Sequence, residues 1–247
     1  MPQNRVLILG GTLEARRLSL QLANLQAYDV TTSLKGITSA PQTYGGTVIT
    51  GGFGGLTGFQ NFLHDNNIGI CINAAHPFAA TMTSTAQTAT TTLNVPYLRL
   101  RRGIWKQVPG DIWDVVSTME GVKNRINRSG RVFLAIGSQG MEMFSHLTDA
   151  RFLIRTVDPV DTERRWPNAR YVTGLPNQSV EIETDLLERE NIVQVVARNS
   201  GGAAGYSKLV AARALGLSVI LVSPPAERNG ASVETVEEAV TWLESCL

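Results

Sequence analysis

Four segments of the chain share one pattern: a run of apolar residues, a short loop rich in glycine or small polar residues, and a helix-like sequence. They span residues 5–16, 68–83, 131–144 and 193–208. A buried strand that leads through a tight loop into a helix is the unit of open α/β sheets, and such loops gather at the carboxyl edge of the sheet. Backbone N–H groups at helix N-termini bind anions there. The pattern therefore predicts a parallel α/β chain built around a ligand crevice.

The first part of the chain alternates strand-like and helix-like segments, as expected for an α/β unit. A crossover follows at residues 101–110, where Gly103, Pro109 and Gly110 interrupt any regular element. We therefore expect an N-terminal α/β domain over 1–104. Its predicted strands are 5–9, 28–33, 46–50, 69–73 and 96–100, and its predicted helices are 13–25, 55–66 and 79–93.

A second alternating series predicts a C-terminal α/β domain over 105–247. We expect the first domain to hold a cofactor on its glycine-rich loops, and the second to bind substrate and make further cofactor contacts. The predicted helices are 111–127, a short one from about 138, 179–190, 202–215 and 232–245; the predicted strands are 131–136, 151–157, 170–173, 192–197 and 217–222, with a polar loop at 158–169.

Composition excludes several classes of protein. A net charge of +1 and 6% aromatic residues argue against nucleic-acid binding, and no apolar run reaches the roughly 18–20 residues that span a bilayer. Cys71 and Cys246 have no metal-site or redox spacing, so we expect no metal, reduced thiols and a cytoplasmic protein without a leader. Residues 99–170 carry thirteen basic and eight acidic side chains, mostly arginine among the basic ones. This surplus indicates either a ligand rich in carboxylates or phosphates, or a solvated basic face.

The first glycine-rich loop is Gly10-Gly11-Thr12. It matches the dinucleotide fingerprint only in part, because Thr12 and Ala15 stand where that fingerprint has its second and third glycines. The glycines still let the backbone approach a phosphate, and Thr12 has a hydroxyl to donate. The alternative is a tight turn between strand and helix.

Two further loops predict cofactor contacts. Ser33 and Lys35 follow the second strand, where NAD-binding folds place an acid for the ribose; a lysine there favours the 2′-phosphate of NADPH. A solvated loop lysine is the alternative. The segment Gly51-Gly52-Phe53-Gly54 follows the third strand, and so many glycines indicate that a ligand or another backbone comes close. A flexible turn is the alternative.

Candidate substrate contacts follow other strands. His76 lies after the fourth strand, where it would bind the substrate or cofactor or act as a tentative catalytic acid, although a lone histidine is more often structural. An anion site is predicted at Asn199–Gly202 with Lys208, without the spacing of a P-loop. The complete set of candidates for the substrate is His76, Pro77, Phe78, Arg99, Arg101, Arg155, Asn199, Ser200, Gly201, Gly202 and Lys208.

The chain resembles the precorrin-6A reductase family of cobalamin biosynthesis. Six motifs in family order carry the resemblance: Ile8–Thr12 with Glu14–Arg16, Gly51–Gly55, Ala75–Ala79, Phe133–Gly137, Arg155–Pro159, and Asn199–Gly202 with Lys208. The resemblance implies two Rossmann-like domains with the active site between them. It also implies hydride transfer from a reduced nicotinamide cofactor to ring carbon C19 of a carboxylate-rich tetrapyrrole, giving precorrin-6B; with Lys35 present, we expect this cofactor to be NADPH rather than NADH. Expected partners are that substrate and neighbouring pathway enzymes at hand-over, with a monomeric or weakly oligomeric chain.

Some positions depart from the family pattern. The family pattern has arginine where this chain has Ile37, arginine or a similar residue where it has Ser138, and lysine where it has Arg198. It has Asp-Ala in place of Asn73-Ala74 and Arg-Pro in place of Ser223-Pro224. Two other classes of protein stay open. Another α/β NAD(P)-dependent oxidoreductase is one, although Tyr206-Ser207-Lys208 lacks the Tyr-x-x-x-Lys spacing of short-chain enzymes; a non-catalytic dinucleotide-sensing protein is the other.

Overall fold

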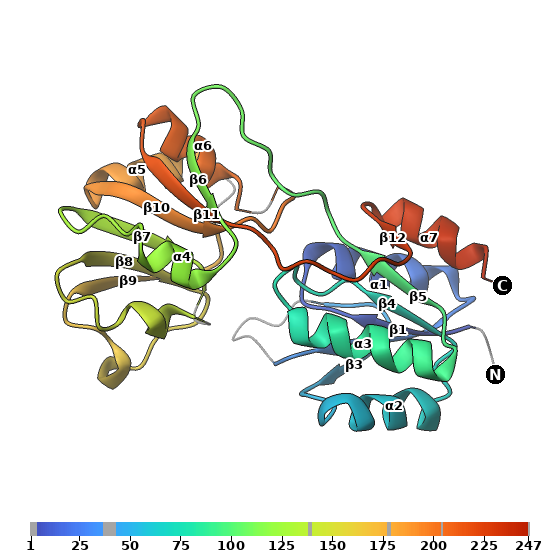
Figure 1. Ribbon diagram of the computed structural model, residues 1–247. Coiled ribbons are helices and arrows are strands. Elements are labelled where there is room, and N and C mark those ends of the chain that lie inside the picture. Colours follow the sequence, from blue (N-terminus) through green and yellow to red (C-terminus); the bar gives the residue numbers. More distant parts are fainter. Residues whose placement is uncertain (1–3, 37–42, 138–139, 177–178, 204, 247) are drawn as a thin grey trace. The chain divides into compact units, whose positions relative to one another are not determined.

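The computed structural model describes residues 4–36, 43–137, 140–176, 179–203 and 205–246 (Figure 1). The chain divides into two compact units, one formed by Met1–Arg102 with Pro225–Leu247 and the other by Gly103–Pro224. Each unit has a six-stranded sheet, and the described strands pair in parallel throughout. The predicted fold class, α/β with two Rossmann-like parallel sheets, is confirmed.

The sheet of the first unit has the order β12-β5-β4-β1-β2-β3. Helices cover both of its faces, so the central strands are continuous apolar runs rather than alternating ones. Residues Val6–Leu9 and Ile70–Asn73 are all buried. The strands are β1 (Arg5–Leu9), β2 (Asp29–Leu34), β3 (Thr47–Thr50), β4 (Ile70–Asn73), β5 (Tyr97–Leu100) and β12 (Ser232–Val233).

Two helices lie on each face of this sheet (Figure 1). Side chains alternate across a strand, so Val6 and Ile8 of β1 pack in one core with α1 and α7. Leu7 and Leu9 point the other way and pack in a second core with α2 and α3. The helices are α1 (Leu13–Leu25), α2 (Gly55–Asp65), α3 (Ala80–Leu93) and α7 (Val236–Glu244).

The sheet of the second unit has the order β6-β11-β10-β7-β8-β9. Its core includes Phe133, Leu153 and Val195 of the sheet, which pack with Leu186 of α5 and Leu209 of α6. Among the described residues, no helix combines the length and apolarity needed to cross a membrane. The elements are β6 (Ile112–Val116), α4 (Met119–Lys123), β7 (Arg131–Ala135), β8 (Arg151–Thr156), β9 (Ala169–Thr173), α5 (Val180–Arg189), β10 (Ile192–Arg198), α6 (Ser207–Ala214), β11 (Ser218–Val222) and the 3₁₀ turns η1 (Met141–Phe144) and η2 (Thr162–Arg164).

The predicted helix over 111–127 is wrong. Residues Ile112–Val116 form edge strand β6, which pairs with β11. Ile, Trp and Val favour a pleated, half-buried surface, and at an edge two of them stay open to solvent, since Ile112 and Val115 are 54% and 55% exposed. Only the short α4 follows; its N-cap Thr118 accepts a hydrogen bond from the Gly121 N–H.

Two predicted helices begin later than expected. Helix α6 begins at Ser207 rather than 202, because Gly201, Gly202 and Gly205 have left-handed φ values of 67°, 69° and 78° that no right-handed helix contains. Helix α7 begins at Val236 rather than 232. Its N-cap Thr235 forms a capping box with Glu238, while the residues before it form β12.

The expected assignment of residues 225–247 to the second domain differs from the structure. Strand β12 pairs with β5, and Val236, Ala239, Val240 and Leu243 of α7 belong to the core that contains Leu18 and Leu22 of α1. This assignment depends on packing between residues that are far apart in the sequence, because the apolar face of α7 is buried in the core of the first sheet. The first unit is therefore built from both ends of the chain.

Candidate active site

The carboxyl edge of the first sheet has a topological switch point between β1 and β4. The loop after β1 leads to α1 on one face, and the loop after β4 leads to α3 on the other, so the two loops diverge. Ligands of open α/β sheets bind at such points. A small hollow lies there, lined by Thr12, Glu14, Ala74, Ala75, Pro77, Leu100, Arg101 and Arg102.

Thr12 joins the two diverging loops. Its Oγ1 accepts a hydrogen bond from the Ala15 N–H over 3.1 Å, which caps α1, and donates to the Ala74 carbonyl over 2.7 Å. A hydroxyl has one proton, so the expected donation from Thr12 to a phosphate does not fit this arrangement. Thr12 instead fixes the distance between the loops on either side of the hollow.

The backbone after β1 is held against β2. The Gly10 N–H donates to the Ser33 carbonyl over 2.8 Å, and a Cβ at Gly10 would lie 2.9 Å from side-chain carbons of Thr32 and Leu34. Gly10 is thus required by packing. Gly11 differs, because it has a φ of 102° and nothing within 4 Å of an added Cβ. Its open side leaves room for a ligand.

The glycine-rich loop after β3 is fixed at one residue and open at the others. The ring of Phe53 meets those of Phe59 and Phe62 edge-on, with centroids 4.7 and 5.0 Å apart. An added Cβ at Gly51, Gly52 or Gly54 would have nothing within 4 Å. Phe53 therefore fastens the loop to α2, and the glycines leave space along its backbone. Lys35 follows Leu34, whose carbonyl accepts a hydrogen bond from the Gly51 N–H, and it is exposed.

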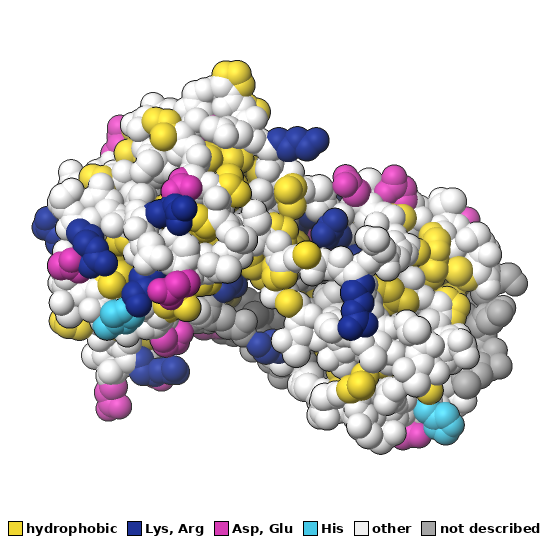
Figure 2. Space-filling model, viewed as in Figure 1, with side chains coloured by type: hydrophobic (Ala, Val, Ile, Leu, Met, Phe, Trp, Pro, Cys, Tyr) yellow, Lys and Arg dark blue, Asp and Glu magenta, His cyan; other side chains and the backbone are white. Residues whose placement is uncertain are grey.

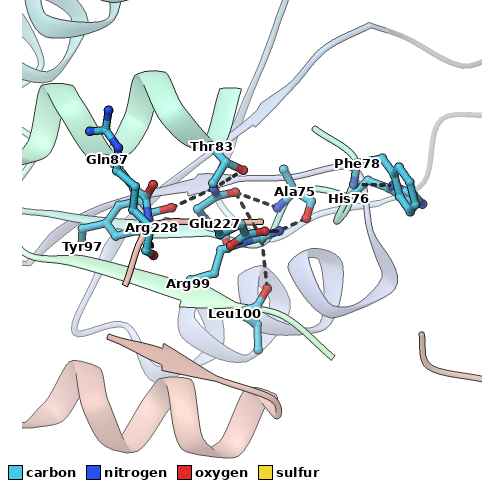
Figure 3. Close-up of polar contacts among 11 residues, drawn as sticks. Ala75, His76, Phe78, Thr83, Gln87, Tyr97, Arg99, Leu100, Glu227 and Arg228 are labelled. Atoms are coloured by element: carbon cyan, nitrogen blue, oxygen red, sulfur yellow. Dashed lines mark hydrogen bonds and ion pairs between the residues drawn. The ribbon is translucent and has the colours of Figure 1, made fainter. Parts of the chain in front are cut away.

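His76 follows β4 at the start of a tight turn. The Phe78 N–H donates to its Nδ1 over 3.2 Å, and the two rings lie 5.7 Å apart (Figure 3). A ring nitrogen that accepts a hydrogen bond carries no proton, so this contact favours the neutral imidazole with its proton on Nε2. Pro77 is buried and lines the hollow.

Arg99 is not placed to bind a substrate. Its side chain is 3% exposed and paired with Glu227 through two hydrogen bonds of 2.9 and 3.0 Å. Its Nη1 donates to the carbonyls of Asn73, Ala75 and Leu100. Because these donors are used within the protein, the expectation that Arg99 grips a carboxylate is wrong.

Other arginines also have partners. Arg102 donates to both carboxylate oxygens of Glu14 beside the hollow, at 3.1 and 2.9 Å. On the face seen in Figure 2, basic side chains of the second unit lie beside acidic ones. The basic surplus of the middle segment is partly matched by ion pairs with acidic residues outside that segment: Arg131–Glu190, Arg155–Glu183 and Arg170–Glu190. Arg101 remains as an expected substrate arginine that lines the hollow.

The loop after β10 in the second unit holds Trp105. The Asn199 amide accepts from the Trp105 N–H over 2.8 Å and donates to the Trp105 carbonyl over 3.0 Å. The indole N–H of Trp105 donates to the Gly202 carbonyl over 2.6 Å. The Asn199 side chain and the Gly202 carbonyl therefore hold the chain just after the unit boundary, a role that the sequence did not reveal. Ser200 and Gly201 lie between them.

Lys208 and Arg155 form a buried group of charges in the same unit. Arg155 donates to Glu183 over 2.7 Å and lies over the Phe133 ring. The Lys208 ammonium donates to the Gly205 carbonyl and lies 5.5 Å from the Trp105 ring centroid. Burial lowers the pKa of Lys208 to about 8, with an opposing effect from Glu183 and a further lowering from Arg155. Both side chains were expected to bind substrate, but both are turned into the unit.

Comparison with known proteins identifies the family. The family described as precorrin-6x reductase CbiJ/CobK matches residues 5–244. The chain belongs to this family. A precorrin-6A reductase from Sinorhizobium sp is 40% identical over 98% of this chain and 95% of the relative, and one from Rhodobacter capsulatus is 38% identical over 97% and 95%. A solved structure titled CobK precorrin-6A reductase superimposes with a TM-score of 0.92 at 38% identity, covering 98% of this chain and 97% of the other.

The resemblance found from the motifs is thereby confirmed, and the family is one of nicotinamide-dependent reductases of the cobalamin pathway. One departure from the expected family pattern has a visible consequence. Asn73 stands where aspartate was expected, and its amide donates to Tyr97 Oη over 2.9 Å and to Thr83 Oγ1 over 3.1 Å. A carboxylate cannot donate both bonds. The departures at Ile37 and Ser138 lie outside the described residues.

The structure brings part of the expected site together. The loops that carry Gly10–Thr12, Ser33–Lys35, Gly51–Gly54 and His76–Phe78 lie along one sheet edge, joined by the hydrogen bonds from Gly10 to Ser33, from Gly51 to Leu34 and from Thr12 to Ala74. The loop Asn199–Gly202 lies on the other sheet. Sequence reasoning missed the Glu14–Arg102 pair at the hollow and the partner of Arg99. Glu14 belongs to the first motif, and its position there was a signal that could have marked it as a site residue. No sequence pattern near Glu227 indicated that it pairs with Arg99.

Proposed function

We propose that this protein is a precorrin-6A reductase that transfers a hydride from NADPH to the macrocycle and yields precorrin-6B. The observation that carries the proposal is the match of nearly the whole chain to relatives of that name at 35–40% identity. Short motifs alone recur on many α/β folds. Full-length similarity at this level also covers the loops that carry the chemistry.

The carboxyl edge of the first sheet fits a dinucleotide. Gly11, Gly51, Gly52 and Gly54 have open space where a side chain would otherwise stand, so a pyrophosphate could approach their backbone. The nicotinamide supplies the hydride when bound. We propose Gly10, Gly11, Thr12, Ser33, Lys35, Gly51, Gly52, Phe53 and Gly54 as the residues around this cofactor.

NADPH is proposed over NADH because of Lys35. It is exposed after β2, where the ribose of a dinucleotide lies in Rossmann folds, and no acidic side chain is adjacent in sequence. An ammonium group there forms a charge-assisted contact with a 2′-phosphate, whereas the ribose hydroxyls of NADH offer it less.

The substrate is proposed to be cobalt-free. Relatives named precorrin-6A reductase are 35–40% identical to this chain, whereas those named cobalt-precorrin-6A reductase, such as the one from Priestia megaterium, are 25–27% identical. For its carboxylates we propose Arg101 and the backbone of Ser200–Gly202 as contacts.

His76 is proposed to touch the substrate, together with Pro77 and Phe78. The Phe78 N–H donates to the His76 Nδ1, which orients the ring within the turn. Hydride addition must be accompanied by a proton, which His76 or water supplies. Because water can replace it, the role of His76 is orientation first and proton donation second.

The decisive test is an anaerobic incubation of the protein with precorrin-6A and NADPH. Consumption of NADPH with a shift of the tetrapyrrole absorbance, and a product two mass units heavier, is expected. NADH and cobalt-precorrin-6A serve as comparisons and should react more slowly. If the protein reduces cobalt-precorrin-6A faster, the substrate assignment is wrong; if it reduces neither, the proposed function is wrong.

A further inference from the structure

The backbone that leads into His76 is held by side chains from two other elements. The three carbonyls that precede His76 each accept a hydrogen bond. Arg99 of β5 donates to Asn73 and Ala75 over 2.9 and 3.0 Å, and Thr12 donates to Ala74 over 2.7 Å. Loop carbonyls usually bond to water or to nearby backbone. Here the loop after β4 is fixed from both sides.

The Asn73 side chain completes this arrangement. Its Oδ1 accepts from the Ala75 N–H over 3.0 Å, while its amide donates to Tyr97 and Thr83 as described above. Asn73 is fully buried. The Asn73 side chain and the carbonyls of Asn73, Ala74 and Ala75 thus all have partners. Figure 3 shows the contacts of Ala75 within this network.

The guanidinium at the centre of this network depends on a distant carboxylate. Arg99 is 3% exposed and Glu227 12%, and they form a two-point ion pair although they are 128 residues apart. A buried charge without its partner is strongly destabilising. Glu227 lies in the segment that begins at Pro225, where the chain re-enters the first unit.

We propose that Arg99 and Glu227 are a positioning pair that sets the conformation of the turn carrying His76 for the reductase reaction. Glu227 compensates the charge of Arg99, and Arg99 orders the carbonyls of Asn73 and Ala75, which directs the His76 ring. Neither side chain touches the reactants. The inference rests on the proposed function for the role of the turn, but its structural part is independent of any activity.

The central variant replaces the pair by apolar residues of similar size, Arg99→Met with Glu227→Leu. Such a double replacement often preserves stability because no buried charge is left alone. We expect normal NADPH binding and a nearly unchanged KM for NADPH. We expect kcat to fall by about tenfold to a hundredfold, the range of a misplaced catalytic contact.

A mutant cycle with His76→Ala separates positioning from general damage. If the pair acts through His76, adding His76→Ala to the double variant should cost less than threefold more in kcat, because the effects of coupled residues are not additive. Fully multiplicative losses would overturn the proposal. Arg99→Lys keeps a charge and some of the donors, so it should recover part of the lost kcat relative to Arg99→Met.

Arg131→Met is a matched control. Arg131 pairs with Glu190 over 3.0 Å and also donates to the Glu190 carbonyl, but it lies in β7 at the start of the strand, away from the carboxyl edge. We expect it to lower thermal stability as Arg99→Met does, while kcat stays within twofold of wild type. A comparable loss of kcat in this control would show that Arg99 contributes to the stability of the fold and not to the positioning of His76.

Amide hydrogen exchange tests the positioning without substrate. In the double variant, the amides of Ala75 and Phe78, which donate to Asn73 and His76, should exchange at least tenfold faster, with the amides of β1 unchanged. Unchanged protection of both amides would overturn the proposal even in an active enzyme. Conversely, faster exchange of these amides in a protein that reduces no precorrin would support the positioning role of the pair and show that the proposed function is wrong.

Discussion

The ammonium group of Lys208 lies among the Trp105 ring, the Gly205 carbonyl and the buried Arg155–Glu183 pair. Burial lowers its pKa to about 8, below the ordinary lysine value of 10.5. Between these two values the unfolded chain binds a proton that the folded chain has released. Stability therefore rises with pH across this window through this group.

The first prediction compares Lys208→Met with wild type. The methionine removes the titration, so the wild-type free energy of unfolding should rise relative to the variant between pH 8 and 10.5, by on the order of 3 kcal/mol for a shift of this size. Urea unfolding at pH 7.5, 9 and 10 measures the difference. A difference that stays constant with pH would show that Lys208 titrates normally.

The second prediction concerns Lys35 and cofactor choice. Lys35→Ala should weaken NADPH binding by about tenfold, as expected for one lost charge-assisted contact, and leave NADH binding within twofold. Titration of both cofactors by nicotinamide fluorescence gives the two dissociation constants. If their ratio is the same as in wild type, Lys35 does not read the 2′-phosphate.

The third prediction concerns His76. His76→Ala should slow turnover by about tenfold to a hundredfold, because water can still supply the proton. His64→Ala is the control, since His64 is exposed in the same unit and contacts Asp65; it should leave turnover unchanged. No loss for His76→Ala would remove it from the site, and a loss beyond about ten-thousandfold would make it the essential acid.

Individual side-chain roles were the least predictable part of the site. The loops at the carboxyl edge could be located from sequence, because a glycine-rich turn after an apolar run is a local signal. The partners of Arg99 and Asn199 are 128 and 94 residues away, and no local pattern encodes them. For the same reason arginines near strand ends looked like substrate contacts when Arg99 and Arg155 are internal.

At the scale of elements, the glycines in the loop after β3 and at the start of α2 are needed for two different reasons. Gly58 in α2 is needed because a Cβ there would lie 1.7 Å from the Phe53 carbonyl. Gly52 has no such neighbour, and its φ lies outside the left-handed region. The fold alone therefore gives no reason for a glycine at 52, and approach of a ligand does.

The fourth prediction uses that contrast. Gly52→Ala should leave thermal stability within about 1 kcal/mol of wild type, the usual range for a compatible site, and weaken NADPH binding by at least tenfold. Gly230→Ala is the matched control, because its added Cβ also meets nothing within 4 Å; it should change neither property. Equal NADPH affinity in both variants would mean that the loop is only a turn.

Element prediction succeeded where the local signal was strong and failed at boundaries set by backbone geometry or by distant packing. The buried strands of both sheets were found from their apolar runs. The predicted helix over 111–127 is wrong because the pairing of β6 with β11, which lies about a hundred residues further along the chain, decides the structure there. The late start of α6 depends on the left-handed conformation of three glycines. The sequence shows that these residues are glycines but does not show which conformation they adopt.

At the scale of the whole molecule, the first unit is discontinuous in sequence. Residues 225–247 supply β12, helix α7 with the apolar face that packs with α1, and the carboxylate that compensates Arg99. The second unit, Gly103–Pro224, is continuous and has its own core. Loss of the last segment should therefore affect the two units unequally.

The fifth prediction follows from that asymmetry. Deleting residues 225–247 should expose the core around Leu18 and Leu22 and leave Arg99 unpaired, so peptides from α1, β4 and β5 should exchange amide hydrogens much faster. Peptides from β7, β10 and α6 should keep wild-type rates, because their packing lies within the second unit. Hydrogen exchange followed by mass spectrometry measures both, and equal acceleration in the two units would show that they do not fold separately.

This discontinuity also sets an order of events during synthesis. A ribosome adds roughly 5–20 residues per second, so the last residue of the continuous second unit is added before the final β-strand and helix of the first are translated. Until Glu227 leaves the exit tunnel, the nascent chain carries Arg99 without its counter-charge and a sheet with one face covered by α1 alone. The unit that carries the loop of His76 is thus begun before the second unit and finished after it.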